Sequence, residues 1–372
     1  MSPKIVLFGA TGYTGARIAE AMTRRGLQPV LAGRDRSRLA AMADRLGGLP
    51  VGVADATDQA SVRALLAEGD VLVSTVGPFQ RYGEPVVAAA VDAGAIYFDS
   101  TGEPPFIRRV FEHHGPAAAR TGAALLTAFG NDYVPGTLAG AMALTDAGVA
   151  TAKVHTGYFI TGGGGQGFSK GTLNSLAGVL FEPMYSWRDG ALVSEQAGAR
   201  YRTFQVAGRA RPAVSIGATE QFALPRLAAT GVAPRLREVD TYLGWFGPIS
   251  RAVHFGSRGV PLFAKIEPLS RALSAVAKAA VKRAAEEPSA AALARTTSYF
   301  IGEAFSPTGD LLASAILSAP DGYAVTAELL AWGAGHAMLH GVSGSGALDA
   351  ICAFGLDTLT EGAAEAGIIR QH

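Results

Sequence analysis

The chain has 372 residues, of which 49% are hydrophobic and 17% are charged, and 32 basic residues balance 31 acidic ones. This length is about right for two domains, and so apolar a composition excludes intrinsic disorder. The net charge of +1 gives no basic footprint for nucleic acid. One cysteine, Cys352, excludes an internal disulfide and a thiolate metal site. No apolar run approaches the roughly 20 residues that cross a bilayer, and no signal peptide is recognisable, so the sequence predicts a soluble cytoplasmic protein.

Residues 4–128 alternate short apolar runs with amphipathic stretches. Near-continuous apolar strands between helices are typical of a parallel sheet that is covered on both faces. We therefore expect an α/β fold that begins with a Rossmann-type, doubly wound parallel sheet over residues 1–135. The strands of this domain are expected at 4–8, 29–32, 51–54, 70–74, 96–98 and 123–127.

Beyond residue 131 the pattern changes to strands with few helices between them. Candidate strands lie at 149–160, 201–206, 236–243, 296–305 and 311–318. Such a series predicts an α+β domain with a mainly antiparallel sheet, placed at 136–339, and we expect this domain to bind substrate and to mediate dimerisation. The domain boundary is placed at 339, and the helical stretches 324–339 and 347–366, with the rest of 340–372, are expected to pack back on the first domain.

A glycine turn joins the first strand to the first helix. In this position glycines let the backbone approach a pyrophosphate, whose charge meets the free N–H groups at the helix N-terminus. A tight turn without a ligand is the alternative, but the strand–turn–helix context favours a dinucleotide site. The residues expected to bind the cofactor here are Gly9, Thr11, Gly12, Tyr13, Thr14 and Gly15.

The end of the second strand distinguishes NADP from NAD. An acidic residue there binds a ribose 2′-hydroxyl, whereas an arginine binds a 2′-phosphate. Gly33 and Arg34 occupy this place, so the sequence predicts NADP(H). Asp55, after the third strand, is expected to border the adenine, with a helix N-cap as the alternative.

The segment after the fourth strand is expected to lie beside the nicotinamide ribose, because cofactors bind at the carboxyl ends of parallel strands. It contains Val76, Gly77 and Pro78. We therefore expect these three residues to contact the cofactor.

Several motifs together resemble the saccharopine dehydrogenase-like reductases, and in particular the bacterial trans-acting enoyl reductases. They are the GATGYTG turn, the AGR at 32–34, the VGPF at 76–79, the YFDSTGE at 97–103 and the FGNDYVP at 129–135. Segments 169–172 and 321–326 are also similar to that branch, whereas 131–133 and 343–347 depart from its pattern. The resemblance implies an NADP-dependent oxidoreductase of the enoyl reductase type.

A proton donor is the other group that such a reaction needs. The chain has no Tyr-x-x-x-Lys pair, and His336 and His340 stand four residues apart without a third metal ligand, so no metal site is expected. Asp132, Tyr133 and Tyr158 are the candidate catalytic residues, and we expect the proton to come from Tyr133 or from a water that it orders. Interdomain packing is the alternative for Tyr133, while capping of the helix that starts at Pro135 is favoured over catalysis for Asp132.

Three functions remain open. The first is reduction of a conjugated C=C bond in an apolar small molecule that is polyketide-like or bound to a carrier, which the aromatic residues between 158 and 246 favour. The second is C=N reduction, as in imine reductases or amine dehydrogenases, with a substrate carboxylate held by arginines. The third is a nucleotide-binding protein that works at a membrane surface or on an acyl carrier through the basic amphipathic helix 268–287. The candidate clamp residues for the second function are Arg200, Arg202, Arg209 and Arg211.

Overall fold

The computed structural model describes residues 3–162, 182–247, 250–255 and 290–371. It divides into two compact units, Met1–Val134 with Gly322–Ile368 and Pro135–Asp321 with Ile369–His372. The predicted helix 268–287, the segment 169–172 and most of the glycine run 162–165 lie outside the described residues.

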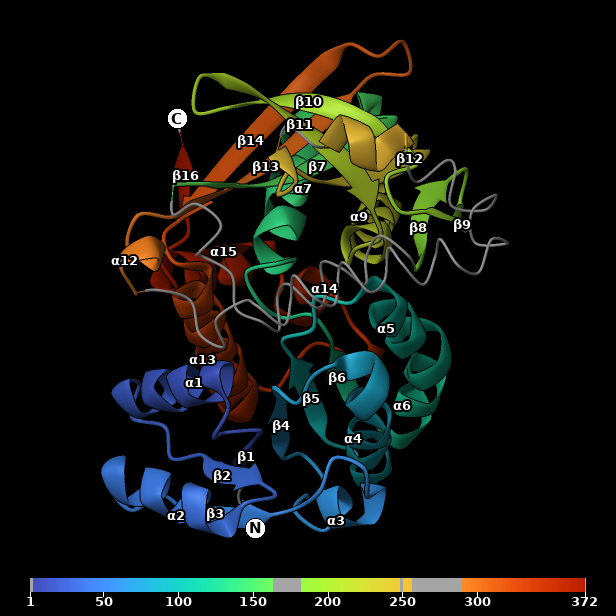
Figure 1. Cartoon of the computed structure of the whole chain (residues 1–372). Helices are drawn as coiled ribbons and strands as arrows, with labels where there is room; N and C mark the ends of the chain where they lie inside the picture. Colours follow the sequence, from blue (N-terminus) through green and yellow to red (C-terminus); the bar gives the residue numbers. More distant parts are fainter. Residues whose placement is uncertain (1–2, 163–181, 248–249, 256–289, 372) are drawn as a thin grey trace, which may run out of the picture. The chain divides into compact units, whose positions relative to one another are not determined.

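The first unit is built on a seven-stranded sheet in the order β15-β6-β5-β4-β1-β2-β3, and every neighbouring pair is parallel (Figure 1). This arrangement confirms the predicted Rossmann-type sheet. The four residues of β1 are almost fully buried, as expected for a strand covered on both faces. The strands are β1 (Ile5–Phe8), β2 (Val30–Gly33), β3 (Val51–Val53), β4 (Val71–Ser74), β5 (Ile96–Asp99), β6 (Ala124–Leu126) and β15 (Gly346–Ala347).

The strand order reverses between β1 and β4, which is the feature that creates a binding crevice. From β1 the chain proceeds to β2 and β3 on one side, and it then returns to β4 on the other. In open parallel sheets, ligands bind outside the carboxyl ends of the strands at such a switch point. The loops after β1, β2, β4, β5 and β6 therefore define the candidate site.

Helices cover both faces of this sheet. Figure 1 shows α1, α2 and α13 on one side of the strands and α3, α4 and α6 on the other. The helices of the first unit are α1 (Tyr13–Arg24), α2 (Arg36–Arg45), α3 (Gln59–Arg63), α4 (Phe79–Ala93), α5 (Pro104–Arg109), the π-helix η1 (Val110–His114), α6 (Gly115–Thr121), α13 (Gly322–His340), α14 (Ala350–Phe354) and α15 (Leu356–Glu365).

Helix α13 belongs to the first unit, in agreement with the expectation that the helical stretch 324–339 packs back on that domain, although the predicted boundary lies after it at 339. It packs against α1 and against the interior strands β4, β5 and β1 of the sheet. Its small residues allow close contacts, because a Cβ at Gly333 would lie 2.8 Å from the Phe129 ring and one at Gly335 would lie 3.1 Å from Leu27. The helix is therefore part of the core beside the glycine turn.

The second unit contains a nine-stranded sheet in which β12 and β7 run parallel and the other described pairs are antiparallel. The mainly antiparallel sheet is thus confirmed. Its main path is β10-β11-β12-β7-β13-β14-β16, and β8 pairs with β12 and β9. The strands are β7 (Lys153–Thr161), β8 (Pro183–Arg188), β9 (Ala191–Gln196), β10 (Tyr201–Val206), β11 (Arg209–Ile216), β12 (Glu238–Leu243), β13 (Thr297–Phe305), β14 (Leu311–Ala319) and β16 (Ile369–Gln371).

Helix α7 (Val134–Ala147) lies against one face of this second sheet at glycine contacts. A Cβ at Gly302 would lie 2.2 Å from the Ala139 carbonyl oxygen, and one at Gly140 would lie 2.9 Å from Thr156. Since real Cβ atoms do not approach so closely, glycine at these positions lets the helix backbone approach the strands. The other helices of this unit are the 3₁₀ helix η2 (Gly148–Ala150), α9 (Glu220–Leu227), the π-helix η4 (Ala228–Val232) and α12 (Ala290–Leu293).

No helix among the described residues is long and apolar enough to cross a membrane.

Candidate functional site

The three glycines of the turn after β1 have different structural roles. A Cβ at Gly9 would lie 2.6 Å from Thr75 Oγ1, and Gly9 has a φ of +88° that side chains disfavour. A Cβ at Gly15 would lie 2.2 Å from the Gly9 carbonyl oxygen. At Gly12 a Cβ would approach one neighbour, the same oxygen, at 3.3 Å. Packing therefore requires the first and third glycines, while Gly12 leaves the start of α1 accessible.

The start of α1 is suited to a pyrophosphate. Gly12 is the N-cap and offers no side-chain acceptor to the first N–H groups of the helix, so they can bind an anion. Thr14 lies in the first turn, and the Tyr13 ring packs edge-to-face on Tyr323 with ring centroids 5.3 Å apart. The Thr11 carbonyl accepts a hydrogen bond from Arg38 at 3.1 Å.

The end of β2 presents guanidinium groups and no free acid. Arg34 follows Gly33 and is exposed. Asp35, the next residue, caps α2 by accepting a hydrogen bond from the Arg38 backbone N–H at 3.0 Å. The carboxylate that would repel a 2′-phosphate is thus engaged by the helix. This arrangement fits NADP(H).

Asp55 follows β3 but does not cap α3, because the N-cap of that helix is Asp58. Asp55 Oδ1 accepts hydrogen bonds from the backbone N–H and the hydroxyl of Thr57, both at 2.8 Å. These bonds, with a smaller contribution from the Arg34 charge, lower the pKa of the Asp55 carboxyl. Asp55 is therefore an anion near Arg34, and its predicted contact with adenine stays a prediction.

We expect Arg34→Ala to weaken NADPH binding about tenfold or more and to leave NADH binding nearly unchanged. A charge-assisted hydrogen bond to a phosphate contributes about 1.5–3 kcal/mol, and NADH has no 2′-phosphate. Titration calorimetry with both nucleotides measures the effect. Arg45→Ala, at the opposite end of α2, is the matched control. Equal losses for the two nucleotides would contradict the role of Arg34.

The segment after β4 lies against the glycine turn and leads into α4. Thr75 donates its hydroxyl to the Gly9 carbonyl at 3.1 Å, and Val76 and Gly77 continue to Pro78, the N-cap of α4. Proline has no side-chain acceptor for the helix. Instead, Glu103 accepts hydrogen bonds from the backbone N–H groups of Phe79 and Gln80, both at 2.9 Å.

Asp99 joins the loops that follow β5 and β6. Its side chain is fully buried and accepts hydrogen bonds from the Thr101 N–H at 2.9 Å, the Ala128 N–H at 2.8 Å and the Thr127 hydroxyl at 2.7 Å. Burial raises the pKa of Asp99 to about 6 despite these bonds. The sequence analysis noted Asp99 and Glu103 as parts of a motif but assigned them no role. The sequence signal that could have indicated a role for both residues is their position at the carboxyl end of a predicted strand, beside the expected cofactor site.

Asp132 and Tyr133 lie in the loop after β6, at the edge of the sheet that carries the glycine turn. Tyr133 is 3% exposed, and its hydroxyl donates to the Gly102 carbonyl at 3.4 Å. Asp132 is half-buried as a residue, and its carboxyl group points toward Gly102. Its Oδ2 lies 2.9 Å from the position that a Cβ on Gly102 would take. Burial of the carboxyl raises the pKa of Asp132 to about 6, although a hydrogen bond from Asn131 lowers it.

Tyr158, the third catalytic candidate, belongs to the second unit, and its hydroxyl donates to the buried carboxyl of Glu220. Burial raises the pKa of Glu220 to about 7, while hydrogen bonds from Tyr158 and Thr156 lower it. A Cβ at Gly136 of α7 would overlap the Tyr158 hydroxyl. The hydroxyl therefore lies in a buried network beneath α7, and a catalytic role for Tyr158 stays a prediction.

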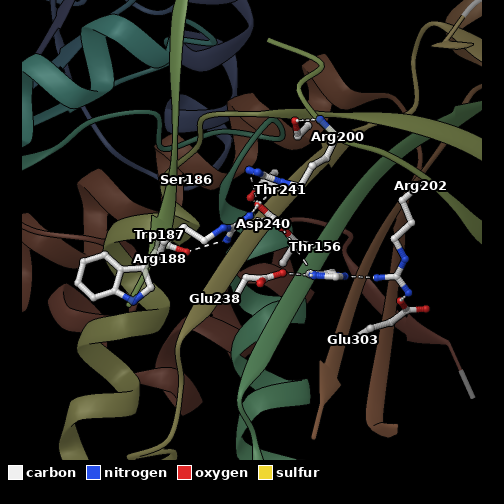
Figure 2. Close-up of polar contacts among 12 residues, drawn as sticks. Thr156, Ser186, Trp187, Arg188, Arg200, Arg202, Glu238, Asp240, Thr241 and Glu303 are labelled. Atoms are coloured by element: carbon white, nitrogen blue, oxygen red, sulfur yellow. Dashed lines mark hydrogen bonds and ion pairs between the residues drawn. The ribbon is translucent and has the colours of Figure 1, made fainter. Parts of the chain in front are cut away.

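A cluster of charged residues on β7, β8, β10, β12 and β13 engages two of the arginines that the sequence suggested as a carboxylate clamp (Figure 2). Asp240, 1% exposed, accepts hydrogen bonds from Arg188 at 2.6 and 2.7 Å and from Arg200 at 3.1 Å. Arg202 contacts Glu303 and His155. The pairing of Arg200 and Arg202 with internal acids makes them poor ligands for a substrate carboxylate. The other two candidate clamp residues, Arg209 and Arg211, lie on β11, where Arg209 is exposed and Arg211 is half-buried.

His155, Glu238 and Asp240 are close enough together to be considered as metal ligands. The contact with Arg202 makes His155 Nδ1 an acceptor, so the other ring nitrogen carries the hydrogen and donates to Glu238 at 3.2 Å. A neighbouring guanidinium group also repels a cation. We therefore interpret the cluster as an ion-pair network.

Comparison with known proteins agrees with this geometry. Residues 5–126 match the family model of the saccharopine dehydrogenase NADP binding domain. Trans-acting enoyl reductases of Mycobacterium ulcerans (strain Agy99) and Mycobacterium leprae (strain TN) are 40% identical over 141 residues and 41% identical over 140 residues. Each alignment covers 36% of this chain and 34% of the relative. A relative from Mycobacterium tuberculosis (strain ATCC 25618 / H37Rv) is 38% identical over 193 residues, which is 47% of this chain and 44% of that protein.

Solved structures resemble the whole chain in fold. Apo saccharopine dehydrogenase (L-Glu forming) from Saccharomyces cerevisiae has a TM-score of 0.60 at 12% identity, over 100% of this chain and 99% of that one. The homospermidine synthase of Legionella pneumophila in complex with NAD has a TM-score of 0.59 at 9% identity, over 100% and 92%. At these identities the likeness establishes the fold alone.

The comparisons confirm the resemblance that the motifs indicated. Residues 5–126 match an NADP-binding domain of the saccharopine dehydrogenase type, and the predicted cofactor, NADP(H), is confirmed. The name of the curated relatives and the matched NADP-binding domain agree with the predicted class, an NADP-dependent oxidoreductase. The chain spans less than half the length of the curated relatives that it matches. The reaction named for those relatives is therefore taken up below as a proposal for this chain.

Proposed function

We propose that this protein is an NADPH-dependent reductase that saturates a conjugated C=C bond in an apolar small molecule, polyketide-like or bound to a carrier. The observation that carries the proposal is the convergence of four features on one edge of one parallel sheet. The glycine turn follows β1, Arg34 follows β2, residues 76–78 follow β4 and Asp132 follows β6.

The residues at this edge divide into cofactor-binding and proton-donating groups. Gly12 and the N–H groups of α1 would hold the pyrophosphate, Arg34 the 2′-phosphate and residues 76–78 the nicotinamide end. When bound, NADPH supplies the hydride. In the same proposal, the first unit binds the cofactor and the second unit provides substrate binding and dimerisation.

Asp132 is the proposed proton donor. Its pKa of about 6 leaves part of the carboxyl protonated near neutral pH, and its Oδ2 would release a proton to the carbon α to the substrate carbonyl. Tyr133 donates its hydroxyl to Gly102, so we give it a positioning role beside Asp132. The proton at the α-carbon, with the hydride at the β-carbon, completes the reduction.

Two observations favour C=C over C=N reduction. The curated relatives are named enoyl reductases, and Arg200 and Arg202 pair with acids of their own unit. A substrate derived from an amino acid would leave its charges poorly matched without such partners. The third function depends on helix 268–287, which lies outside the described residues.

The test is oxidation of NADPH by the purified chain, followed by absorbance, with panels of enones, enoyl thioesters and imines. We expect turnover with enoyl thioesters or enones and little with imines. The loss of that turnover in Arg34→Ala at limiting NADPH ties the signal to the proposed site. Turnover of an amino-acid imine, with none on any enone or enoyl thioester, would contradict the proposal.

A further inference from the structure

The N-terminus of α4 is closed by an acidic side chain from another loop. A helix leaves its first four N–H groups without partners inside the helix, and Pro78 at the N-cap cannot accept from them. Glu103, 24 residues further along the chain, accepts from Phe79 with one carboxylate oxygen and from Gln80 with the other. Both oxygens are thus used, and the side chain is 8% exposed.

Glu103 is itself held by the loop that follows β5. Its backbone N–H donates to the Thr101 hydroxyl at 3.1 Å, and the Thr101 N–H donates to Asp99 at 2.9 Å. Asp99 also accepts from Thr127 and Ala128, in the loop that leads to Asp132. A continuous set of hydrogen bonds therefore links the start of α4 to the loops after β5 and β6.

The same contact distinguishes α4 from α1. Both helices begin at the carboxyl edge of the sheet, directly after strands that flank the switch point. A carboxylate of the chain neutralises the positive end of α4, whereas the N-cap of α1 is a glycine with no side-chain acceptor. A pyrophosphate would therefore bind more favourably at α1 than at α4, and the bonds from Glu103 hold the start of α4 at residues 79 and 80.

We propose that Glu103 is a positioning residue for the nicotinamide half of NADPH, which it serves by fixing residues 76–80 at the start of α4. The inference rests on the proposed function, because it takes these residues to contact the nicotinamide end. Glu103 itself contacts the protein backbone and need not contact the cofactor. Its loss should weaken contacts to the nicotinamide half and leave the adenosine half bound normally.

The test compares two ligands on the full chain by titration calorimetry: NADPH, and adenosine 2′,5′-bisphosphate, which carries the adenosine half alone. In Glu103→Gln an amide NH2 replaces one acceptor and faces a backbone N–H. We expect about a tenfold or greater loss of NADPH affinity, with adenosine 2′,5′-bisphosphate affinity unchanged within about twofold. Glu103→Asp keeps the charge but shortens the reach, so we expect a smaller loss in the same direction.

Two control variants separate this role from general damage. Glu112→Gln is the matched surface change, since Glu112 pairs with Arg108 on the exposed side of η1, and it should alter neither affinity. Arg34→Ala should weaken both ligands, because both carry the 2′-phosphate. If Glu103→Gln does not fold, judged by circular dichroism, Glu103→Asp decides the question.

Equal losses for the two ligands, or no loss for either in a folded variant, would overturn the inference. Binding is measured without a substrate, so this result is independent of turnover. A failure of the enone and enoyl thioester assays would contradict the proposed reaction alone.

Discussion

Gly12→Val is expected to abolish NADP(H) binding while the apo protein keeps its stability. Gly12 has φ −78° and ψ 167°, an extended conformation that any residue adopts, so valine causes no backbone strain there. Its Cβ would lie 3.3 Å from the Gly9 carbonyl oxygen, which is tight but can be relieved by a small shift. The two methyl groups beyond it would fill the space in front of the first N–H groups of α1, where we expect the pyrophosphate to bind.

Thermal unfolding with and without NADP measures this effect. A ligand at 100 times its Kd stabilises the native state by about 2.7 kcal/mol, so the wild-type melting temperature should rise with NADP. We expect no rise in Gly12→Val, and an apo melting temperature within about 3 °C of wild type.

Gly15→Val is the contrasting variant for this prediction. A Cβ at Gly15 would lie 2.2 Å from the Gly9 carbonyl oxygen, inside the packed contact between α1 and the turn. This variant should lose stability even without a ligand. A normal NADP-dependent rise in Gly12→Val would show that the pyrophosphate binds elsewhere.

The parts of the structure that sequence could predict depend on local patterns. The six predicted strands of the first sheet are short apolar runs, and the glycine turn directly follows one of them, whereas the two-residue β15 has no such signal and is not predicted. The hairpins of the second unit carry a local signal too. Asp189 and Gly190 connect β8 to β9, and Ala207 and Gly208 connect β10 to β11, all with positive φ. Asp-Gly between two strand-like runs indicates a hairpin, and the sequence analysis did not use it.

Helix α13 shows why the predicted domain boundary at 339 is weaker than the predicted helix. Its buried residues, among them Val325, Leu329, Leu330 and Trp332, lie on several sides of the helix, so no single apolar stripe shows what it packs against. Its assignment to the first unit depends on contacts with α1 and β4, which are hundreds of residues away in the sequence.

The candidate site shows the same limit. The Glu103 contact with α4 spans 24 residues, and the Asp99 contact with Ala128 spans 29. No periodicity connects such residues. The pairing of Arg202 with Glu303, across 101 residues, likewise decides whether this arginine is open to a substrate. Residue types at the ends of the strands therefore predict a candidate site, whereas the partner of each charged side chain is visible only in the fold.

Asp132→Asn is expected to lower kcat for enone or enoyl thioester reduction by about 10²-fold or more. Asparagine has nearly the same shape as aspartate, but its amide does not donate a proton to carbon. Asp132 follows β6, and none of the predicted cofactor contacts involves it, so the Kd for NADPH should stay within about twofold of wild type. Stopped-flow single turnovers and a binding titration measure the two quantities.

The pH dependence provides a second signature of the same group. Burial raises the pKa of Asp132 from 3.8 to about 6, and the donor is the protonated form. The wild-type single-turnover rate should therefore fall as pH rises through about 6, and this inflection should be missing from the residual rate of Asp132→Asn.

Tyr133→Phe separates the two candidate donors. It removes the hydroxyl that donates to Gly102 and leaves the Asp132 carboxyl in place, so the pH inflection should persist with a smaller loss of rate. The opposite pattern, a loss of 10²-fold or more in Tyr133→Phe and a normal rate in Asp132→Asn, would assign the proton to Tyr133. Because both residues follow β6, either result keeps the proton donor at the same edge of the sheet as the cofactor loops.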